Sequence, residues 1–256
     1  MEISTFLNRI AYAGPADASS AVLSALHQAH MEHVPFENLD IPRGRPIVLE
    51  YGALYEKIVA RRRGGFCYEV NGLFAELLRA LNFEVTLLSA RVALGEGTFG
   101  PEFDHLTLRV QCPADADPHT FWLADVGFGD SFTEPLRFVA DAQPQGLRAY
   151  RLEPIAPDAY LLWQKNYDGS WQEQYRFTLT PHLLSDFAEM CHNHQTSPAS
   201  SFTRKRIISR ATPHGRVSLD PNRLIVTKDG ARQEFPVADA AEYDALLWQQ
   251  FGVRLD

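Results

Sequence analysis

The sequence lacks several features that would place the protein in a particular class. It contains only three cysteines, Cys67, Cys112 and Cys191, an odd number with wide spacing that argues against a disulfide framework. No apolar run approaches the roughly 20 residues that a membrane-spanning helix needs. Residues 1–6 have neither the basic nor the apolar region of a secretory signal. We therefore predict a cytoplasmic protein with free thiols and no membrane partner.

Motifs for phosphate binding and for serine hydrolysis are also missing. The chain has no Walker-type glycine-rich loop followed by Lys-Ser/Thr and no Gly-x-Ser-x-Gly segment. A formal net charge of −8 argues against nucleic acid as a partner, because binding to a phosphate backbone needs a basic surface. The composition is that of an ordinary globular protein, with 45% hydrophobic and 22% charged residues over 256 positions. Such a length suffices for one large core or two modest ones.

The first third of the chain has the hydrophobic spacing of helices. Apolar residues recur at intervals of three and four positions, and Pro35 is expected to end the second helix. The glycine pair Gly64-Gly65 is expected to stop the third helix. Helices are predicted at residues 6–10, 22–31, 51–62 and 68–81.

The centre of the chain changes to the alternation of strands, and the tail is mixed. Helices followed by a strand-rich centre indicate an α+β protein rather than repeated βαβ units. Strands are predicted at residues 85–88, 106–110, 120–126, 149–152, 160–164, 173–179, 206–210, 216–219 and 224–227. Two further helices are predicted at residues 183–193 and 239–251.

Cys67 lies where a cysteine can become reactive. It opens the fourth predicted helix, and the N-terminus of a helix favours an anion such as a thiolate. Arg61, Arg62 and Arg63 stand just upstream and are expected to add positive potential. Most free cysteines simply fill cores. The glycine pair before Cys67 favours the reactive alternative, because glycine there indicates a tight turn or a close backbone approach.

A cysteine nucleophile needs a base, and the base needs a group that orients it. His105 opens a predicted strand on the face opposite Leu106, at a strand end that can hold a catalytic group rigidly, although an ordinary half-exposed strand histidine fits the same pattern. Asp125 closes another strand, where an acid is costly to bury without a partner such as a histidine N–H. Asp104 and Asp130 are alternative acids, but both lie at turn-like positions that suit a solvated carboxylate or a cap.

The remaining histidines have simpler interpretations. A row on the second helix at three-residue spacing could bind a metal, but an exposed helix face is favoured because zinc sites need three or four convergent ligands. A second group lies beside Cys191 without another pair at zinc-finger spacing, and a third lies in predicted loops where it is expected to be solvated. These groups are His27, His30 and His33; His192 and His194; and His119, His182 and His214. No metal is predicted.

Five segments together resemble the arylamine N-acetyltransferase family. The most specific is the run from Arg63 to Phe74 around Cys67, Arg-Gly-Gly-Phe-Cys-Tyr-Glu-Val-Asn-Gly-Leu-Phe. It is followed by Asp-His-Leu at residues 104–106 and Asp-Val-Gly-Phe-Gly at residues 125–129. Residues 34–39 are similar to the N-terminal signature of the family, and residues 251–255 to its usual ending. The resemblance thus spans nearly the whole chain.

The resemblance implies a fold similar to the papain and transglutaminase superfamily. In that arrangement residues 1–84 form a helical bundle that carries the nucleophile. Residues 85–190 form an antiparallel β-barrel that carries the histidine and the aspartate, and residues 191–256 form an α/β lid.

The resemblance also implies a site and a reaction. Cys67 is the acyl acceptor, His105 the base and Asp125 its orienting group. An aromatic amine, hydrazine or N-hydroxyarylamine receives the acetyl group of acetyl-CoA by a ping-pong mechanism, as in xenobiotic metabolism. Glu37 and Arg63 pair to brace the cysteine loop, and the protein is a monomer or homodimer. The substrate-binding residues are Phe36, Phe66, Gly127, Phe128, Gly129 and Phe202.

Three alternatives stay open at this point. An amide synthase of the same family would close a macrolactam from a polyketide thioester with identical catalytic residues. A cysteine peptidase or transglutaminase would use the same triad on peptide or glutamine amides. A binding module would keep the fold without catalysis.

Overall fold

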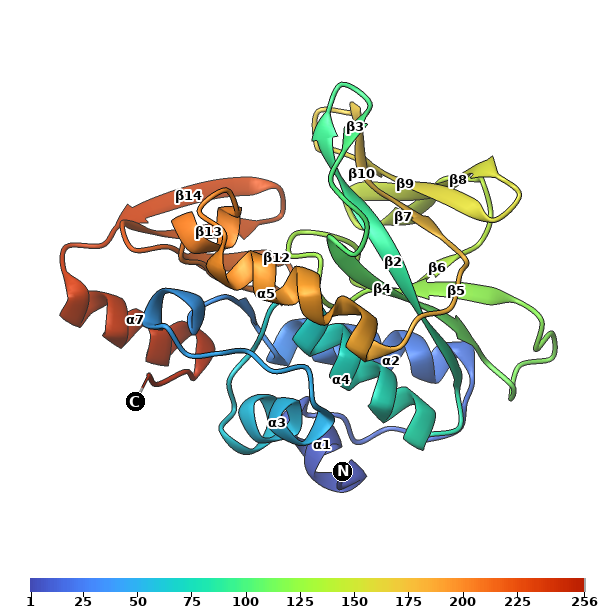
Figure 1. Cartoon of the computed structure of the whole chain (residues 1–256), viewed down its shortest axis with the longest axis horizontal. Helices are drawn as coiled ribbons and strands as arrows, with labels where there is room; N and C mark the ends of the chain where they lie inside the picture. The colour runs from blue at the N-terminus through green and yellow to red at the C-terminus, as the bar shows by residue number, and fades with distance from the viewer. Residues whose placement is uncertain (256) are drawn as a thin grey trace.

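The first third of the chain forms a layer of helices at the base of the molecule (Figure 1). The computed structural model describes residues 1–255. The Ser19 hydroxyl accepts a hydrogen bond from the amide of Val22 and so starts the second helix, which ends at His33 before Pro35, as predicted. The elements are α1 (Ile3–Arg9), α2 (Ser20–His33), the 3-10 turn η1 (Ile41–Arg43), α3 (Tyr51–Tyr55), the π-helical turn η2 (Glu56–Ala60) and α4 (Cys67–Ala80).

The predicted third helix is shorter than expected and is not stopped by the glycine pair. It changes from α3 to the π-helical η2 and ends at Ala60, and Arg62 then takes a left-handed φ of +53°. Arg9 of α1 explains this ending. Its guanidinium donates a hydrogen bond at 2.9 Å to the carbonyl of Ile58, an acceptor that a longer helix would have used internally, and a second at 3.0 Å to the carbonyl of Arg63.

Helix α4 is the most buried helix of this layer. Leu73, Phe74, Leu77 and Leu78 are all at most 1% exposed, and they pack between the other helices and strands of the barrel. Burial of each such side chain contributes about 1.5–3 kcal/mol before entropy is counted. The first residue of α4 is therefore held on a rigid support.

The centre of the chain forms a strongly curved antiparallel sheet, a nearly closed barrel (Figure 1). Its order is β6-β5-β4-β2-β10-β9-β8-β7, with β3 paired to β2. At the seam the Gln143 side chain donates to the Arg137 carbonyl and accepts from the Arg137 amide, which joins β7 to β6. The strands are β2 (Glu84–Gly95), β3 (Thr98–Phe99), β4 (His105–Gln111), β5 (Phe121–Ala124), β6 (Leu136–Arg137), β7 (Gln143–Gln145), β8 (Arg148–Ala156), β9 (Ala159–Lys165) and β10 (Trp171–Thr178).

The last third adds a second sheet of order β1-β11-β12-β13-β14. Its edge strand β1 (Phe36–Glu37) comes from the N-terminal part, and Phe36 pairs with Ser209. Strand β14 was not predicted, because its exposed residues show no apolar alternation. The elements are η3 (Leu184–Phe187), α5 (Ala188–Thr196), α6 (Ser201–Arg204), β11 (Ile208–Thr212), β12 (Gly215–Leu219), β13 (Arg223–Lys228), β14 (Ala231–Pro236) and α7 (Ala240–Phe251).

Three apolar clusters accompany these parts. One joins the helices to one face of the barrel, one fills the barrel, and one lies between α7 and the second sheet. The structure thus confirms the predicted α+β class. The domain boundaries at 84/85 and 190/191 stay a prediction, and the second of them falls inside α5.

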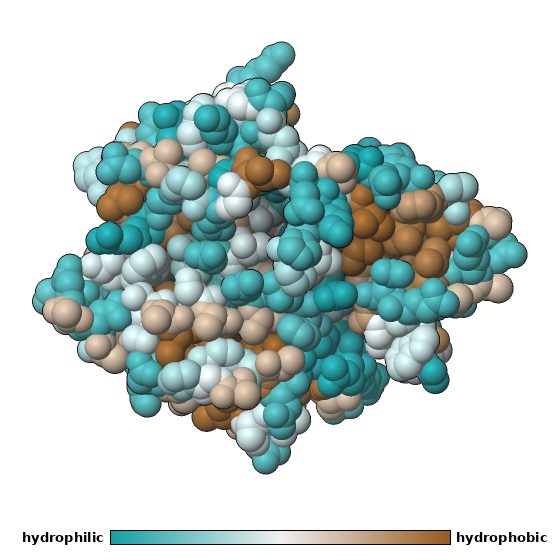
Figure 2. All heavy atoms as spheres, turned by 180° about the vertical axis from the view of Figure 1, so that it is seen from behind, coloured by the Kyte–Doolittle hydropathy of each residue, from teal (hydrophilic) through white to brown (hydrophobic). Residues whose placement is uncertain are grey.

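The face seen in Figure 2 is mostly polar. Figure 2 shows hydrophilic side chains over much of the rear face, with apolar side chains gathered on the side where the second sheet lies. Phe235 on β14 is one exposed apolar residue of that sheet. Across residues 1–255, none of the helices combines the length and the apolar character required to cross a bilayer.

Candidate active site

Cys67 is the first residue of α4 and follows a loop that packs tightly against β1. A Cβ atom on Gly64 would lie 1.8 Å from the carbonyl oxygen of Pro35, and one on Gly65 would lie 2.7 Å from the Cβ atom of Glu69. Both positions therefore require glycine. The close backbone approach predicted from the glycine pair is confirmed.

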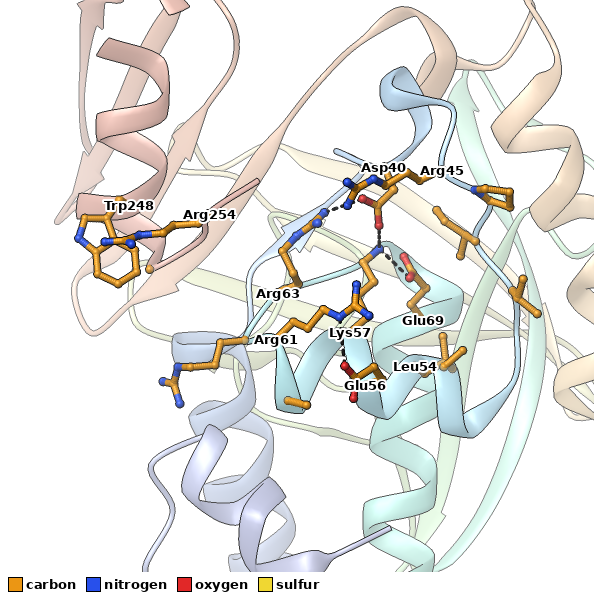
Figure 3. Close-up of a pocket in the computed structure, with 17 residues that line it drawn as sticks. Asp40, Arg45, Leu54, Glu56, Lys57, Arg61, Arg63, Glu69, Trp248 and Arg254 are labelled. Carbon is orange, nitrogen blue, oxygen red and sulfur yellow. Dashed lines mark hydrogen bonds and ion pairs between the residues drawn. The ribbon is translucent and has the colours of Figure 1, made fainter. Parts of the chain in front are cut away.

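A buried chain of charges supports this loop (Figure 3). Arg63 contacts Glu37 at 2.8 Å and Asp40 at 3.0 Å. Lys57 contacts Asp40 and Glu69 at 2.8 Å each. All five side chains are at most 15% exposed. The network fixes the segment that leads into Cys67.

Glu69 connects that network to the start of α4. Its Oε2 accepts a hydrogen bond from the amide of Phe66 at 3.1 Å, which caps the helix. Burial raises the pKa of Glu69 to about 6, although Lys57 and the Phe66 amide oppose the shift. A helix N-terminus anchored in this way leaves the amides of Cys67 and Tyr68 without intrahelical acceptors, so they can donate to a ligand.

His105 and Asp125 meet as a hydrogen-bonded pair. His105 opens β4 and Asp125 follows β5, and His105 Nε2 lies 2.6 Å from Asp125 Oδ2. A carboxylate acceptor places the proton on Nε2 and leaves Nδ1 as the basic nitrogen. Both residues are at most 2% exposed, so His105 is not the half-exposed strand histidine of the alternative interpretation.

Asp125 remains ionised because four donors surround it. Its Oδ2 also accepts from the Tyr175 hydroxyl at 2.8 Å, and its Oδ1 accepts from Asn71 at 2.9 Å and from the Gly127 amide at 3.0 Å. Burial alone would raise the pKa of Asp125. The adjacent His105 and these hydrogen bonds more than offset that cost and hold the pKa below its usual value.

Three supporting residues were not predicted. Asn71 accepts from the amide of Val126 as well as donating to Asp125, so it joins α4 to the strand end. His27 accepts a hydrogen bond from the Asp125 amide at 3.0 Å. Tyr175 reaches Asp125 from β10. Asn71 stands four residues after Cys67, on the same face of α4, which is a sequence signal that could have indicated it.

The electrostatics at Cys67 differ from the prediction. Burial raises the pKa of the Cys67 thiol well above its ordinary value, and the charges of Asp125 and Asp104 add to the rise, against a hydrogen bond from the Leu106 main chain. The upstream arginines do not compensate, since Arg63 is neutralised by acids and Arg61 pairs with Glu56. The thiol therefore keeps its proton until a neighbouring base accepts it.

A cavity of about 440 Å³ lies beside Cys67. Cys67 and His105 line it, together with four residues of the predicted substrate-binding set, Phe36, Gly127, Phe128 and Phe202. The ring of Phe128 lies edge-on to His105 at 5.0 Å between centroids. The cavity thus combines a thiol, an imidazole and aromatic walls.

Phe66 and Gly129, the other two predicted substrate-binding residues, do not line the cavity. Phe66 is fully buried and packs edge-on against Tyr68 and Phe202 at 5.0 and 5.6 Å, so it lies behind the cavity wall. Gly129 has a φ of +76° and lies outside the lining, where glycine serves the turn. Contact with a substrate is therefore expected from Phe202 rather than from Phe66.

Two histidines of the second helix are not where the sequence suggested. His27 and His30 are fully buried rather than on an exposed face, because α2 is enclosed by α4 and by the strand β11. His30 lies between Phe6 and Phe74. Within residues 1–255, no group of three metal-ligating side chains converges.

The two alternative acids have partners of their own. Asp130 contacts Arg148 at 2.7 Å and Arg216 at 3.0 Å, which ties the 127–129 loop to the barrel and to the second sheet. Asp104 lies 3.3 Å from His194, and its side chain is only 15% exposed. The solvated carboxylate predicted for Asp104 is thus wrong, because α5 covers it.

A substitution at Gly127 is expected to damage the site directly. A Cβ atom there would lie 2.8 Å from both Cys67 Cα and Asn71 Nδ2. We expect Gly127→Ala to lower the free energy of unfolding by about 1–3 kcal/mol, as overpacking does. Urea denaturation measures this loss. Gly146→Ala is the control, because a Cβ atom at Gly146 would touch nothing and only the positive φ of that residue opposes alanine. Equal stability of Gly127→Ala and the unaltered protein would contradict the close contact.

The buried His27 is expected to make stability fall in acid. Burial lowers the pKa of His27 to about 4, against opposing hydrogen bonds with Thr133 and Asp125. Between about pH 6.5 and pH 4 the unfolded chain binds a proton that the folded chain refuses, so unfolding becomes easier as pH falls. The loss from this group is about 3 kcal/mol over the full window.

Urea denaturation at pH 7 and pH 4.5 measures this effect. The His27→Asn variant is expected to have a lower free energy of unfolding at pH 7, but this free energy is expected to fall less between pH 7 and pH 4.5 than that of the unaltered protein. An identical loss in both proteins would show that His27 does not carry the acid sensitivity.

Comparisons with known proteins show similarity over nearly the whole chain. A family model described as N-acetyltransferase matches residues 20–256. The chain is 34% identical to the arylamine N-acetyltransferase of Escherichia coli strain K12, over 98% of this chain and 88% of that one. The solved structure of M. smegmatis arylamine N-acetyltransferase is similar with a TM-score of 0.91 and 34% identity, over 100% of this chain and 93% of that one. The Mycobacterium marinum enzyme in complex with CoA is similar with a TM-score of 0.89 and 31% identity, over 98% and 93%.

Proposed function

Because this chain belongs to the arylamine N-acetyltransferase family, we propose that it moves the acetyl group of acetyl-CoA to aromatic amines through a thioester on Cys67. Arylhydrazines and N-hydroxyarylamines are acceptors of the same kind. The observation that carries the proposal is the Asp125–His105 pair on the wall of the cavity that holds Cys67.

The first half-reaction loads the enzyme. His105 Nδ1 takes the proton of the Cys67 thiol as the sulfur attacks the thioester carbonyl of acetyl-CoA. The C–S bond to coenzyme A then breaks, and the departing sulfur receives the proton from His105. Asp125 stabilises the intervening imidazolium. Since burial raises the pKa of Cys67, the thiolate forms together with its imidazolium partner and not alone.

The second half-reaction transfers the acetyl group from Cys67 to the acceptor. The acceptor nitrogen attacks the acetyl carbonyl on Cys67, its N–H proton passes to His105 Nδ1, and the C–S bond to Cys67 breaks. The proton then returns to the sulfur, which restores the free enzyme. The amides of Cys67 and Tyr68 at the start of α4 are suited to stabilise the oxyanion in both halves.

The aromatic walls suit a flat acceptor. Phe36 and Phe202 lie 6.3 Å apart between ring centroids, and Phe128 lies against His105. Aromatic rings of this kind stack on an arylamine and exclude water, which would otherwise hydrolyse the thioester. Glu37 and Arg63 act from behind the loop by holding the start of α4 in place.

Two measurements test the proposal. After exposure to acetyl-CoA, intact mass followed by peptide mapping is expected to show one added acetyl group on Cys67. Initial rates with acetyl-CoA and an arylhydrazine are expected to give parallel double-reciprocal lines. Absence of the acetyl group, or intersecting lines, would overturn the scheme.

Activity assays with simple substrates separate the alternatives. An amide synthase would fail to acetylate simple anilines and hydrazines, and a peptidase or transglutaminase would process casein or a fluorogenic peptide. A binding module would remain unacetylated.

A further inference from the structure

A second cavity, of about 590 Å³, adjoins the chain segment that leads into Cys67 (Figure 3). Its walls come from residues 45–48, from residues 53–63 of α3, η2 and the turn after them, and from the end of the chain at residues 248–254. Among residues 1–255, this cavity and the one beside Cys67 have no lining residue in common. Its volume is typical of a site for a small molecule. The acetyl transfer described above makes no use of it.

Positively charged side chains gather around this cavity, although the chain as a whole carries a net charge of −8. Six cationic and three acidic residues line it. Ile47 and Leu54 add a buried apolar wall, beside which charges attract each other more strongly than in open water. A concave site of one sign attracts small ions of the opposite sign. The cations are Arg45, Lys57, Arg61, Arg62, Arg63 and Arg254.

The acids of the cavity leave part of this positive charge unbalanced. Two of the three carboxylates belong to the buried network described above and are neutralised there. The third, Glu56, lies 3.1 Å from Arg61, but both side chains are more than half exposed, so this ion pair contributes little and can be exchanged. Within residues 1–255, neither Arg62 nor Arg254 forms an ion pair with a carboxylate.

Arg254 is held in a position that suits an anion. Its guanidinium lies over the ring of Trp248, 4.1 Å from the ring centroid. The preceding segment is anchored, because the Gly252 amide donates to the Trp248 carbonyl at 2.9 Å and Val253 is buried against α7. Stacking orients the planar guanidinium and leaves the N–H groups in its plane able to donate. Phosphate and carboxylate groups accept two such hydrogen bonds at once.

The other arginines stand on a turn that is fixed as well. Arg62 has a left-handed φ of +53°, and its carbonyl accepts a hydrogen bond from the guanidinium of Arg9 at 3.3 Å. Figure 3 shows the side chain of Arg61 on the same side of the charge network as Trp248 and Arg254. Two anchored parts of the chain, far apart in sequence, thus bring arginines to one cavity.

We propose that this cavity binds a small multivalent oxyanion. Arg62 and Arg254 are its main ligands, and Arg61 joins them when it exchanges Glu56 for the stronger anion. Two arginines without acidic partners match a ligand that carries at least two negative charges. A diphosphate and a polycarboxylate share this chemistry. The proposal does not depend on the role of Cys67, so it stands or falls separately from the proposed acetyl transfer.

Isothermal titration calorimetry of the whole protein with inorganic pyrophosphate, and separately with citrate, tests the site. We expect one-to-one binding at low ionic strength, together with a change in protein fluorescence that Trp248→Phe abolishes. The probe that binds more tightly identifies the ligand as a phosphate or a carboxylate. Arg62→Gln and Arg254→Gln are each expected to weaken the affinity about tenfold, because each removes a hydrogen bond between charged partners.

Lys165→Gln is the matched control, since it removes one exposed positive charge on β9, outside the cavity lining. It is expected to leave the affinity unchanged. The three substituted side chains are exposed, and urea unfolding of each variant checks the fold. The proposal is overturned if neither probe binds, if either arginine variant keeps full affinity, or if Lys165→Gln weakens binding as much as they do. The second of these outcomes would place the anion elsewhere on the protein, and the third would indicate non-specific attraction.

Discussion

Replacement of Cys67 by alanine is expected to lower kcat/KM for acetyl transfer by about 10⁴-fold or more, as loss of a covalent nucleophile does in comparable enzymes. The reason is structural as well as chemical. The sulfur stands on the first turn of a buried helix, and the other two cysteines, Cys112 and Cys191, are buried outside the cavity lining. No other thiol is placed to accept the acetyl group.

The variant also identifies the site of acylation. Cys67→Ala is expected to gain no acetyl mass from acetyl-CoA although both other thiols remain. Its urea unfolding should stay close to that of the unaltered protein, because alanine removes a single sulfur beside an open cavity. Retention of a tenth or more of the activity in a folded Cys67→Ala protein would exclude any thioester on this residue.

The second large effect is expected for Asp125→Asn. The Asn71 side chain and the Gly127 amide both donate to Oδ1, so the amide oxygen of the new asparagine stays on that side. Its NH₂ group then faces His105 Nε2. An NH₂ group can only donate, so the imidazole proton moves to Nδ1 and the base needed at Cys67 is lost. We expect kcat to fall by about 10³–10⁴-fold.

Tyr175→Phe is the matched control for this prediction. It removes one of the two donors to Asp125 Oδ2 but leaves the carboxylate and its bond to His105. The loss of a single hydrogen bond is expected to cost less than about tenfold in kcat. Comparable losses in the two variants would indicate that Asp125 acts through general packing and not through the tautomer of His105.

Local patterns predicted the elements that carry the chemistry. The glycine pair, Cys67 and the apolar spacing after it place a helix start at Cys67, and the alternation after His105 places β4 correctly. Both signals are local because they arise from backbone conformation and from the burial of one face. The structure brings His105 and Asp125 to one hydrogen bond, as an acid buried at a strand end requires.

Features that depend on distant contacts were missed. The burial of His27 and His30 follows from α2 being enclosed by parts of the chain far from it in sequence, which no helical periodicity reveals. Strand β14 lacks apolar alternation, although the Asp229-Gly230 turn before it, with φ values of +49° and +81°, is a hairpin signal that could have indicated it. Lys57 and Asp40 join a network whose members are scattered over the first 69 residues.

The two-residue strand β1 has a consequence for how the enzyme becomes active. It joins the loop before Cys67, through the bond from the Glu37 amide to the Gly65 carbonyl, to β11 in the last third of the chain. Asn38 adds a hydrogen bond to Lys205, 167 positions away. Contacts of such long range form late, because loop closure must be completed first. A nascent polypeptide therefore lacks this support for the loop before Cys67 until β11 has been synthesised.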